Sequence, residues 1–143
     1  MKLTRASSYA LHAVAYMAQQ RSDKPVASHK IAHERGIPER FLLKVLKPLV
    51  SARVLMSIKG PNGGYRLARS PNDINLLEIV EAVDGPIQGH APLPEPENKK
   101  KYPHYKAETT APLYNKLEHL CKSSAEHLRK SIEKVKVSEL IKK

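Results

Sequence analysis

The cationic side chains best placed to do chemistry lie in two short segments, residues 39–47 and 59–66. The first segment is predicted to lie near the start of a helix, and its outward positions carry three cations and one acid. The second contains Gly63-Gly64, a turn signal that also lets a backbone approach a ligand closely. Lysine and arginine bind phosphate oxygens, so these segments favour a nucleic-acid ligand. The candidate contact residues are Glu39, Arg40, Lys44, Lys47, Lys59, Asn62, Gly63, Gly64, Tyr65 and Arg66.

A set of helices and one hairpin must position these side chains. Apolar residues recur at intervals of three and four along several segments, which is typical of amphipathic helices. Two short strands, at 54–59 and 65–68, flank the Gly-Gly turn and are predicted to form an antiparallel ribbon. The predicted helices are 5–20, 28–35, 38–52, 75–83 and a long one that begins near residue 111.

Several residues mark where these helices begin and end. Thr4 is the predicted N-cap of the first helix, and Gly36 is the predicted left-handed residue that ends the second. Asn75 and Glu78 have the spacing of a capping box at the start of the fourth. Pro48 removes one hydrogen bond from the third, so a kink or an early end is expected there. The apolar set of the third helix, predicted to face the core, is Phe41, Leu42, Val45, Leu46 and Leu49.

The order of these elements is helix, helix, tight turn, helix, and then a ribbon with a glycine-rich tip. This is the layout of a winged helix-turn-helix. The predicted fold class is therefore mainly α with a small β-ribbon, plus a long C-terminal dimerisation helix. The second helix of the pair has the diameter that fits the major groove of DNA, and the hairpin can reach adjacent phosphates or the minor groove. Double-stranded DNA is accordingly the predicted partner.

The chain divides by composition into three parts. Residues 1–85 form the predicted DNA-binding domain, residues 86–110 a loop rich in proline and lysine, and residues 111–143 the long helix and a tail. An apolar stripe on a helix this long needs a partner surface, so a homodimer is predicted, with an intrachain cap as the alternative. The predicted dimer interface is Leu113, Leu117, Leu120, Cys121, Leu128, Ile132 and Val135.

The bulk composition limits the class of protein further. The 143 residues carry a net charge of +11, which favours a polyanionic partner such as DNA, RNA or an anionic membrane, although a well-solvated surface explains the charge equally well. The single cysteine, Cys121, excludes an intrachain disulfide and favours a reducing compartment. Because no signal peptide or membrane-spanning stretch is predicted, the protein is expected in the cytoplasm and not in a membrane. No catalytic constellation stands out, so the protein is predicted not to be an enzyme.

The wing segment carries the most specific resemblance to a known family. The run Lys59-Gly60-Pro61-Asn62-Gly63-Gly64-Tyr65-Arg66-Leu67-Ala68 resembles the wing of the Rrf2 family of bacterial regulators, the group that includes IscR, NsrR and CymR. The resemblance implies a dimer with crossed C-terminal helices on a palindromic operator, read by the third helix in the major groove and by the wing in the minor groove. Lys2 and Thr4, in the matching N-terminal stretch, are further candidate DNA contacts. Other matching stretches are Met1–Thr4, Tyr9-Ala10, Ile31-Ala32, Gly36-Ile37, Leu42, Ile74 and Ile79–Gly85.

The resemblance weakens after residue 85. Cluster-binding relatives place three cysteines in the loop that follows, whereas residues 86–112 contain none, so no iron–sulfur cluster, metal or other cofactor is predicted. His90 and His104, without a thiolate, make a poor metal signature. The predicted function is that of a repressor that binds DNA specifically as a homodimer without a cluster. Two alternatives stay open: a winged-helix dimer that acts through a regulatory protein partner, and a non-specific nucleic-acid binder.

Overall fold

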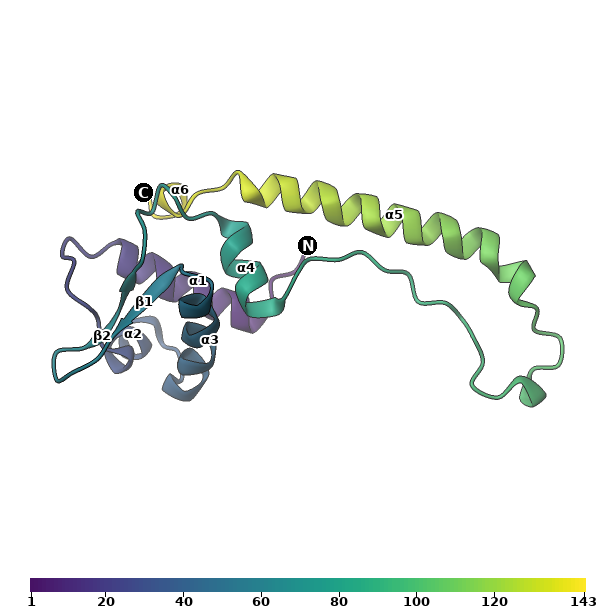
Figure 1. The fold of residues 1–143 in the computed structure, drawn as a ribbon, viewed down its shortest axis with the longest axis horizontal. Helices are drawn as coiled ribbons and strands as arrows, with labels where there is room; N and C mark the ends of the chain where they lie inside the picture. Colours follow the sequence, from purple (N-terminus) through teal and green to yellow (C-terminus); the bar gives the residue numbers. More distant parts are fainter. The chain divides into compact units, whose positions relative to one another are not determined.

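The computed structural model describes all of residues 1–143 and divides into two compact units. The first contains Met1–Pro86 together with Ser131–Lys143, and the second contains Ile87–Lys130. Six α-helices and a two-stranded antiparallel ribbon make up the secondary structure (Figure 1), which confirms the predicted mainly α class. No helix combines the length and the apolarity needed to cross a lipid bilayer. The elements are α1 (Arg5–Ala18), α2 (Ser28–Arg35), α3 (Glu39–Ser51), β1 (Leu55–Ile58), β2 (Gly64–Leu67), α4 (Leu76–Asp84), the short 3-10 helix η1 (Lys99–Lys101), α5 (Ala107–Glu133) and α6 (Val137–Leu140).

The helix-turn-helix and the ribbon are built around one apolar core. α1 packs against α3 and α4, α2 packs against α3, and the ribbon contacts both α1 and α3. Phe41 is 38% exposed, so its prediction as a core residue of α3 is wrong. The physical reason is that the inward face of α3 is already filled by the remaining members of the apolar set, all of them buried: Leu42, Val45, Leu46 and Leu49.

The predicted signals at the helix ends are confirmed. The Thr4 hydroxyl accepts a hydrogen bond from the Ser7 backbone N–H at 3.0 Å and caps α1. Gly36 ends α2 with a φ of 62°, the left-handed conformation that favours glycine. Asn75 caps α4 in a complete capping box with Glu78. The early end expected at Pro48 is wrong, since α3 continues to Ser51, with the next residue after the proline buried in the core.

The C-terminal tail packs into the first unit and does not extend the long helix. α5 ends before Val135, whose carbonyl accepts a hydrogen bond from the Leu76 N–H at 2.9 Å. The Val137 N–H donates to the Ile74 carbonyl at 2.9 Å, and the Val137 side chain is buried in the core. Ile132 is only 8% exposed. Ile132 is therefore covered by its own chain and Val135 lies outside the helix, which shortens the predicted dimer stripe at this end.

The second unit consists of most of α5 and the loop before it. α5 begins at Ala107, earlier than the predicted start near residue 111. The Ala91 N–H donates to the Glu118 carboxylate at 2.7 Å, and His90 Nδ1 lies 3.1 Å from the same group. The hydrogen bond from Ala91 and the contact with His90 lower the pKa of Glu118 below its ordinary value. Gly89 packs so closely on α5 that a Cβ atom there would overlap the Cys121 carbonyl, so the loop is fixed to the helix at this point.

Candidate nucleic-acid interface

α2, the turn after it and α3 form the helix-turn-helix. A hydrogen bond of 2.9 Å from the Ile37 N–H to the Ala32 carbonyl closes the turn. Pro38 is the N-cap of α3, close to the position where a missing N–H costs no helical hydrogen bond. The Ser28 hydroxyl, at the start of α2, donates to the Glu39 carboxylate at 3.1 Å. Glu39 is exposed as predicted for a contact residue, but its carboxylate also joins the starts of the two helices.

The outward face of α3 is cationic. Arg40, Lys44 and Lys47 are all exposed, and their spacing of three and four residues places them on one side of the helix. The Arg40 guanidinium carbon lies 4.8 Å from the centroid of the Phe41 ring, and Lys44 Nζ lies 5.6 Å from it. Both distances are within the range of cation–π attraction. The first turns of α3 therefore present an aromatic ring next to two positive charges.

The wing holds the second set of predicted contacts on an exposed loop. The antiparallel strands β1 and β2 lead into this loop, where Lys59 and Asn62 are exposed. Gly63 and Gly64 have no room for a side chain, because a Cβ atom at either position would overlap a backbone carbonyl of the same unit. The two glycines are thus required by the internal geometry of the wing. In Figure 1 the wing loop and α3 both lie on the lower side of the first unit.

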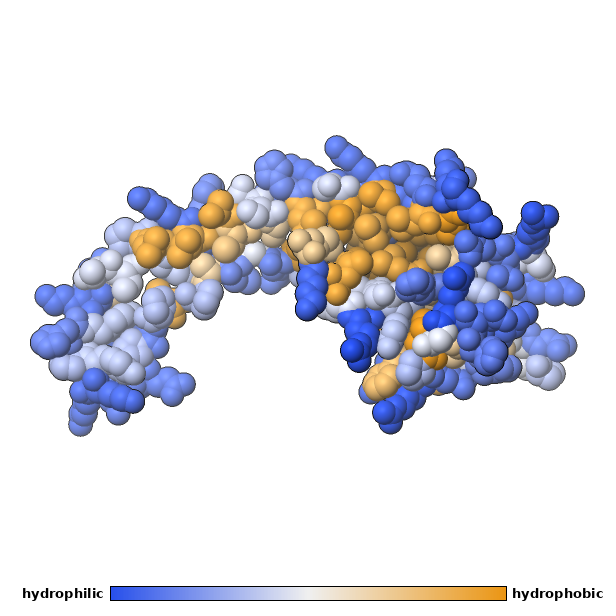
Figure 2. All heavy atoms as spheres, turned by 180° about the vertical axis from the view of Figure 1, so that it is seen from behind, coloured by the Kyte–Doolittle hydropathy of each residue, from blue (hydrophilic) through white to orange (hydrophobic).

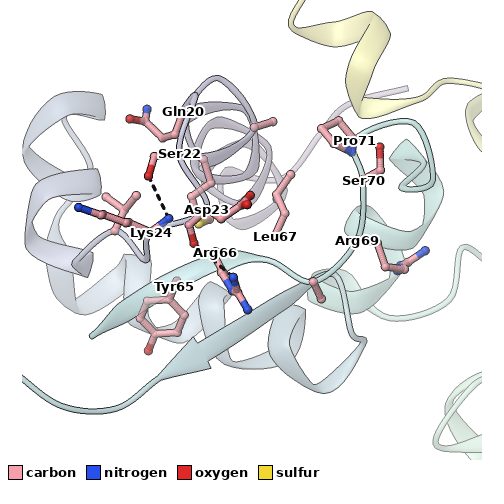
Figure 3. A pocket seen from close by; sticks show the side chains of 14 residues that line it. Gln20, Ser22, Asp23, Lys24, Tyr65, Arg66, Leu67, Arg69, Ser70 and Pro71 are labelled. Carbon is pink, nitrogen blue, oxygen red and sulfur yellow. Dashed lines mark hydrogen bonds between the residues drawn. The ribbon is translucent and has the colours of Figure 1, made fainter. Parts of the chain in front are cut away.

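Tyr65 and Arg66 lie in β2, at the base of the wing. The Tyr65 backbone is paired in both directions with Val26, each hydrogen bond being 2.8 Å long, and the Tyr65 side chain packs against the core. Arg66 Nη1 donates to the Asp23 carbonyl at 3.3 Å, and Arg66 Nε lies 3.1 Å from the Met56 sulfur. Both residues line a hollow of about 340 Å³ (Figure 3). Tyr65 therefore braces the wing, and its direct contact with DNA stays a prediction.

The N-terminal candidates, Lys2 and Thr4, differ in how freely they can bind a ligand. Lys2 is exposed, whereas the Thr4 hydroxyl donates to the Asp84 carboxylate at 2.8 Å. The Ser7 hydroxyl donates to the same carboxylate at 2.6 Å. The negative charge of Asp84 lies at the N-terminus of α1, where the helix dipole favours it. A DNA contact by Thr4 stays a prediction, and it would require a phosphate to replace this carboxylate.

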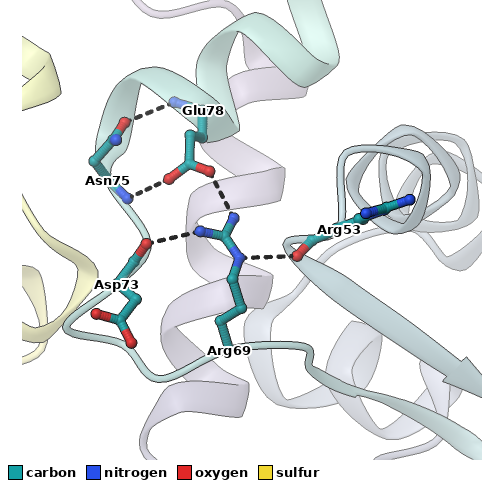
Figure 4. A network of polar contacts seen from close by, with 5 residues as sticks. All are labelled: Arg53, Arg69, Asp73, Asn75 and Glu78. Carbon is teal, nitrogen blue, oxygen red and sulfur yellow. Dashed lines mark hydrogen bonds and ion pairs between the residues drawn. The ribbon is translucent and has the colours of Figure 1, made fainter.

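Arg69, which sequence reasoning missed, ties the base of the wing to α4 (Figure 4). Arg69 Nε donates to the Arg53 carbonyl at 3.2 Å, in the turn between α3 and β1. Arg69 Nη1 donates to the Asp73 carbonyl at 2.8 Å, and Nη2 pairs with Glu78 at 2.6 Å. Arg53 has a φ of 59°, an uncommon left-handed conformation for a residue with a side chain. The Arg69 guanidinium thus joins three backbone segments. No local pattern in the sequence indicates these contacts.

The capping box of α4 is part of the same polar cluster. One Glu78 carboxylate oxygen accepts from the Asn75 N–H at 3.0 Å, while the Asn75 side-chain oxygen accepts from the Glu78 N–H at 2.9 Å. Burial alone would raise the pKa of Glu78. The hydrogen bonds from Arg69 and Asn75, together with the charges of Arg69 and Lys136, outweigh burial and lower the pKa below its ordinary value. Glu78 is therefore held as a carboxylate between the cap and the wing.

A helix-turn-helix with a cationic outer face, followed by a ribbon with an exposed cationic loop, defines a winged helix-turn-helix protein. Residues 3–143 match the sequence model of the Rrf2 family, which is described as an iron-dependent transcriptional regulator. This chain belongs to the Rrf2 family.

Individual relatives support the same assignment. A Rhodobacter capsulatus protein described as an rrf2-like HTH-type transcriptional regulator is 42% identical over 95 residues, which cover 64% of this chain and 61% of that protein. The HTH-type transcriptional regulator IscR of Photobacterium profundum is 36% identical over 84 residues, which cover 59% of this chain and 49% of IscR. The chain thus spans about half to three fifths of the length of these two relatives.

Two solved structures share the fold. The structure of CymR, the global cysteine regulator of B. subtilis, has a TM-score of 0.72 at 21% sequence identity and covers 99% of this chain and 96% of that chain. The structure of T. potens IscR has a TM-score of 0.67 at 20% identity and covers 99% of this chain and 86% of that chain. At these identities the likeness concerns the fold alone, and it confirms the predicted winged helix.

The residues of this chain do not fit the iron that the family description implies. An iron–sulfur cluster is held by several thiolates, with imidazole as an occasional replacement, and Cys121 is the single cysteine of the chain. No group of three or more histidine, cysteine, aspartate or glutamate side chains comes together in a way that could hold a metal ion. His90, in the loop before α5, contacts Glu118. The chain therefore offers no ligand set for such a group.

Proposed function

We propose that this chain is a sequence-specific DNA-binding transcription regulator, a repressor that binds a palindromic operator as a homodimer. The observation that carries the proposal is the cationic outer face of α3 beside an exposed cationic wing loop in one compact unit. Membership of a family described as transcriptional regulators supports it. α3 would enter the major groove, and the wing loop would contact the adjacent minor groove or its phosphates.

Affinity in this proposal comes mainly from phosphate contacts. Lys2, Arg40, Lys44, Lys47 and Lys59 are exposed, and none of them has a carboxylate partner among the ion pairs of the chain. Cations that are not already neutralised can displace the counterions of DNA, and the release of those counterions drives binding. Arg66 is partly engaged with the Asp23 carbonyl, so its contribution should be smaller than that of Lys59.

Dimerisation is proposed on the apolar side chains that the chain leaves uncovered on α5. Leu113 is 64% exposed, Leu117 42% and Leu120 60%, and their spacing places them along one stripe. Cys121 and Leu128 are half-buried beside it. Apolar side chains also gather on one face of the first unit (Figure 2). In the same unit, the exposed side chains of Leu3 and Leu140 help to line a hollow of about 270 Å³. A second copy of the chain would remove these apolar surfaces from water, which favours association.

The proposal includes regulation without an iron–sulfur cluster, because the chain lacks the thiolates that a cluster needs. A regulatory protein partner is then the alternative carrier of the signal. In that case the winged helix would act as an adaptor, and DNA would not be its main ligand.

The decisive experiment selects binding sites from random duplexes with the purified full chain. The expected result is a palindromic motif whose half-sites lie about one helical turn apart. Sedimentation velocity should give the mass of a dimer for the protein alone, and the mass of one dimer plus one duplex for the complex. Equal affinity for the selected duplex and a scrambled one would favour the non-specific binder. Absence of DNA affinity, together with stoichiometric capture of one cellular protein, would favour the adaptor.

A further inference from the structure

Phe41 is an apolar ring at the edge of the cationic face of α3, the face that is proposed to meet DNA. It is 38% exposed and lies in the first turn of the helix, the part of a recognition helix that reaches base edges. The inward face of α3 is filled by other residues, and Phe41 is not among the buried ones. Its position on the surface therefore calls for a role outside the core.

Two cations hold the ring in a defined place. The Arg40 guanidinium carbon is 4.8 Å and Lys44 Nζ is 5.6 Å from the ring centroid. Such contacts restrict the rotamers of long side chains that would otherwise lose conformational freedom on binding. The three side chains thus form a preorganised group in which an apolar ring lies next to two groups that bind phosphate.

We propose that Phe41 is a specificity-determining residue that contacts the C5-methyl group of one thymine in each half-site. The proposal rests on the proposed function, in which α3 enters the major groove. The thymine methyl is the apolar group that the major groove exposes, and phenylalanine is among the side chains that contact it. Arg40 and Lys44 would bind the flanking phosphates and hold the ring at the base edge.

The test removes this methyl group and nothing else. In the duplex selected by the full-length protein, each thymine is replaced in turn by deoxyuridine, and the dissociation constant is measured. Burial of one methyl group corresponds to roughly a fourfold change in affinity, so one position per half-site should weaken binding about fourfold, and both together about fifteenfold. In F41A the same replacements should change affinity less than about twofold, the range within which two uncoupled changes combine additively. In F41Y, which keeps the ring, the sensitivity should remain.

Leu43→Ala is the matched control. Leu43 is another exposed apolar residue of α3, 43% exposed, and lies on the cationic face, three positions after Arg40 and four before Lys47, but on the side away from Phe41. L43A should keep the sensitivity to deoxyuridine at the position assigned to Phe41. The salt dependence of binding should be the same for F41A and the parent protein, because a base contact releases no counterions.

Three outcomes would overturn the inference. If no thymine in the selected site is sensitive to deoxyuridine, or if F41A keeps the sensitivity of the parent protein, Phe41 reads no methyl group, while the proposed DNA-binding function stands. If F41A keeps the sensitivity and instead binds with a weaker salt dependence, Phe41 only positions its cationic neighbours. If the parent protein selects no site at all, both the proposed function and this inference are wrong.

Discussion

Replacing Arg69 with alanine removes the group that joins the base of the wing to α4. The guanidinium donates to the Arg53 and Asp73 carbonyls at 3.2 and 2.8 Å and pairs with Glu78 at 2.6 Å. These partners belong to three backbone segments, so the substitution should lower the free energy of unfolding and loosen the wing at the same time. The apolar core is not altered, and the fold should remain.

The expected loss is about 1–2 kcal/mol. Exposed ion pairs contribute roughly 0.2–1 kcal/mol, and the Arg69 and Glu78 side chains are 35% and 31% exposed, which limits their ion pair to that range. Each of the two hydrogen bonds to a carbonyl contributes about 0.5 kcal/mol, the lower end of the usual range, because water can reach the carbonyl after the side chain is removed. For a chain of this length the midpoint of thermal unfolding should fall by roughly 3–8 °C.

Urea unfolding followed by circular dichroism measures this change, and its pH dependence gives a second check. The pKa of Glu78 is lowered in the folded protein relative to its ordinary value of 4.5. The ion pair therefore contributes fully above the unfolded pKa, and its contribution is lost as the pH falls through the folded pKa. The difference between the parent protein and R69A should be constant near neutral pH and should shrink below about pH 4.5, the ordinary pKa that marks the upper edge of this window.

Arg66→Ala is the matched control for the loss of an arginine near the wing. Arg66 has one hydrogen bond to a carbonyl, at 3.3 Å, and a contact with a sulfur atom, so R66A should lower the free energy of unfolding by less than about 0.5 kcal/mol. A double-mutant cycle of R69A with E78Q should give a coupling of about 0.5–1 kcal/mol. Equal stabilities of R69A and R66A, or additive effects in the cycle, would refute the role given to this cluster.

Three further substitutions test the interface, the wing and the dimer. Lys44→Ala should reduce the slope of log K against log salt by about 0.9 for each phosphate that the variant no longer binds, which filter binding at several salt concentrations measures; an unchanged slope would mean that Lys44 binds no phosphate. Gly64→Ala should lower the free energy of unfolding by roughly 1–3 kcal/mol, because its Cβ would meet the Val26 backbone at a φ of 153°. Gly36→Ala, in the ordinary left-handed region with open space around it, should cost less, and equal losses would contradict the steric explanation. Leu117→Asp should shift the protein toward monomer in sedimentation velocity, whereas Asn115→Asp, on the opposite face of α5, should leave the mass unchanged.

The sequence predicts those features that depend on neighbouring residues. Gly36 and the Asn75–Glu78 capping box are recognisable because each signal and the helix end that it fixes lie within a few positions of each other. Spacing alone puts Phe41 at the edge of the apolar stripe and so predicts it in the core, but only the packing of the other helices decides how wide the buried face is. Arg69 and the buried Val137 depend on partners that are distant in sequence, and no local pattern encodes such contacts.

The polar cluster at the start of α4 also connects the C-terminal tail with the wing. The tail pairs with residues 74–76 through backbone hydrogen bonds, and Asn75, in the middle of that segment, forms the capping box with Glu78. Glu78 in turn pairs with Arg69, which also donates to the Arg53 carbonyl in the turn between α3 and β1. The tail is thus linked to the wing through the cap and Arg69, and also through the hydrogen bond of 3.1 Å from the Ser138 N–H to the Pro71 carbonyl, in the segment that follows β2. R69A leaves every predicted phosphate-binding cation in place, so the number of phosphates bound, and with it the salt dependence of binding, should not change. A loss of DNA affinity at unchanged salt dependence would therefore mean that the substitution has displaced the wing.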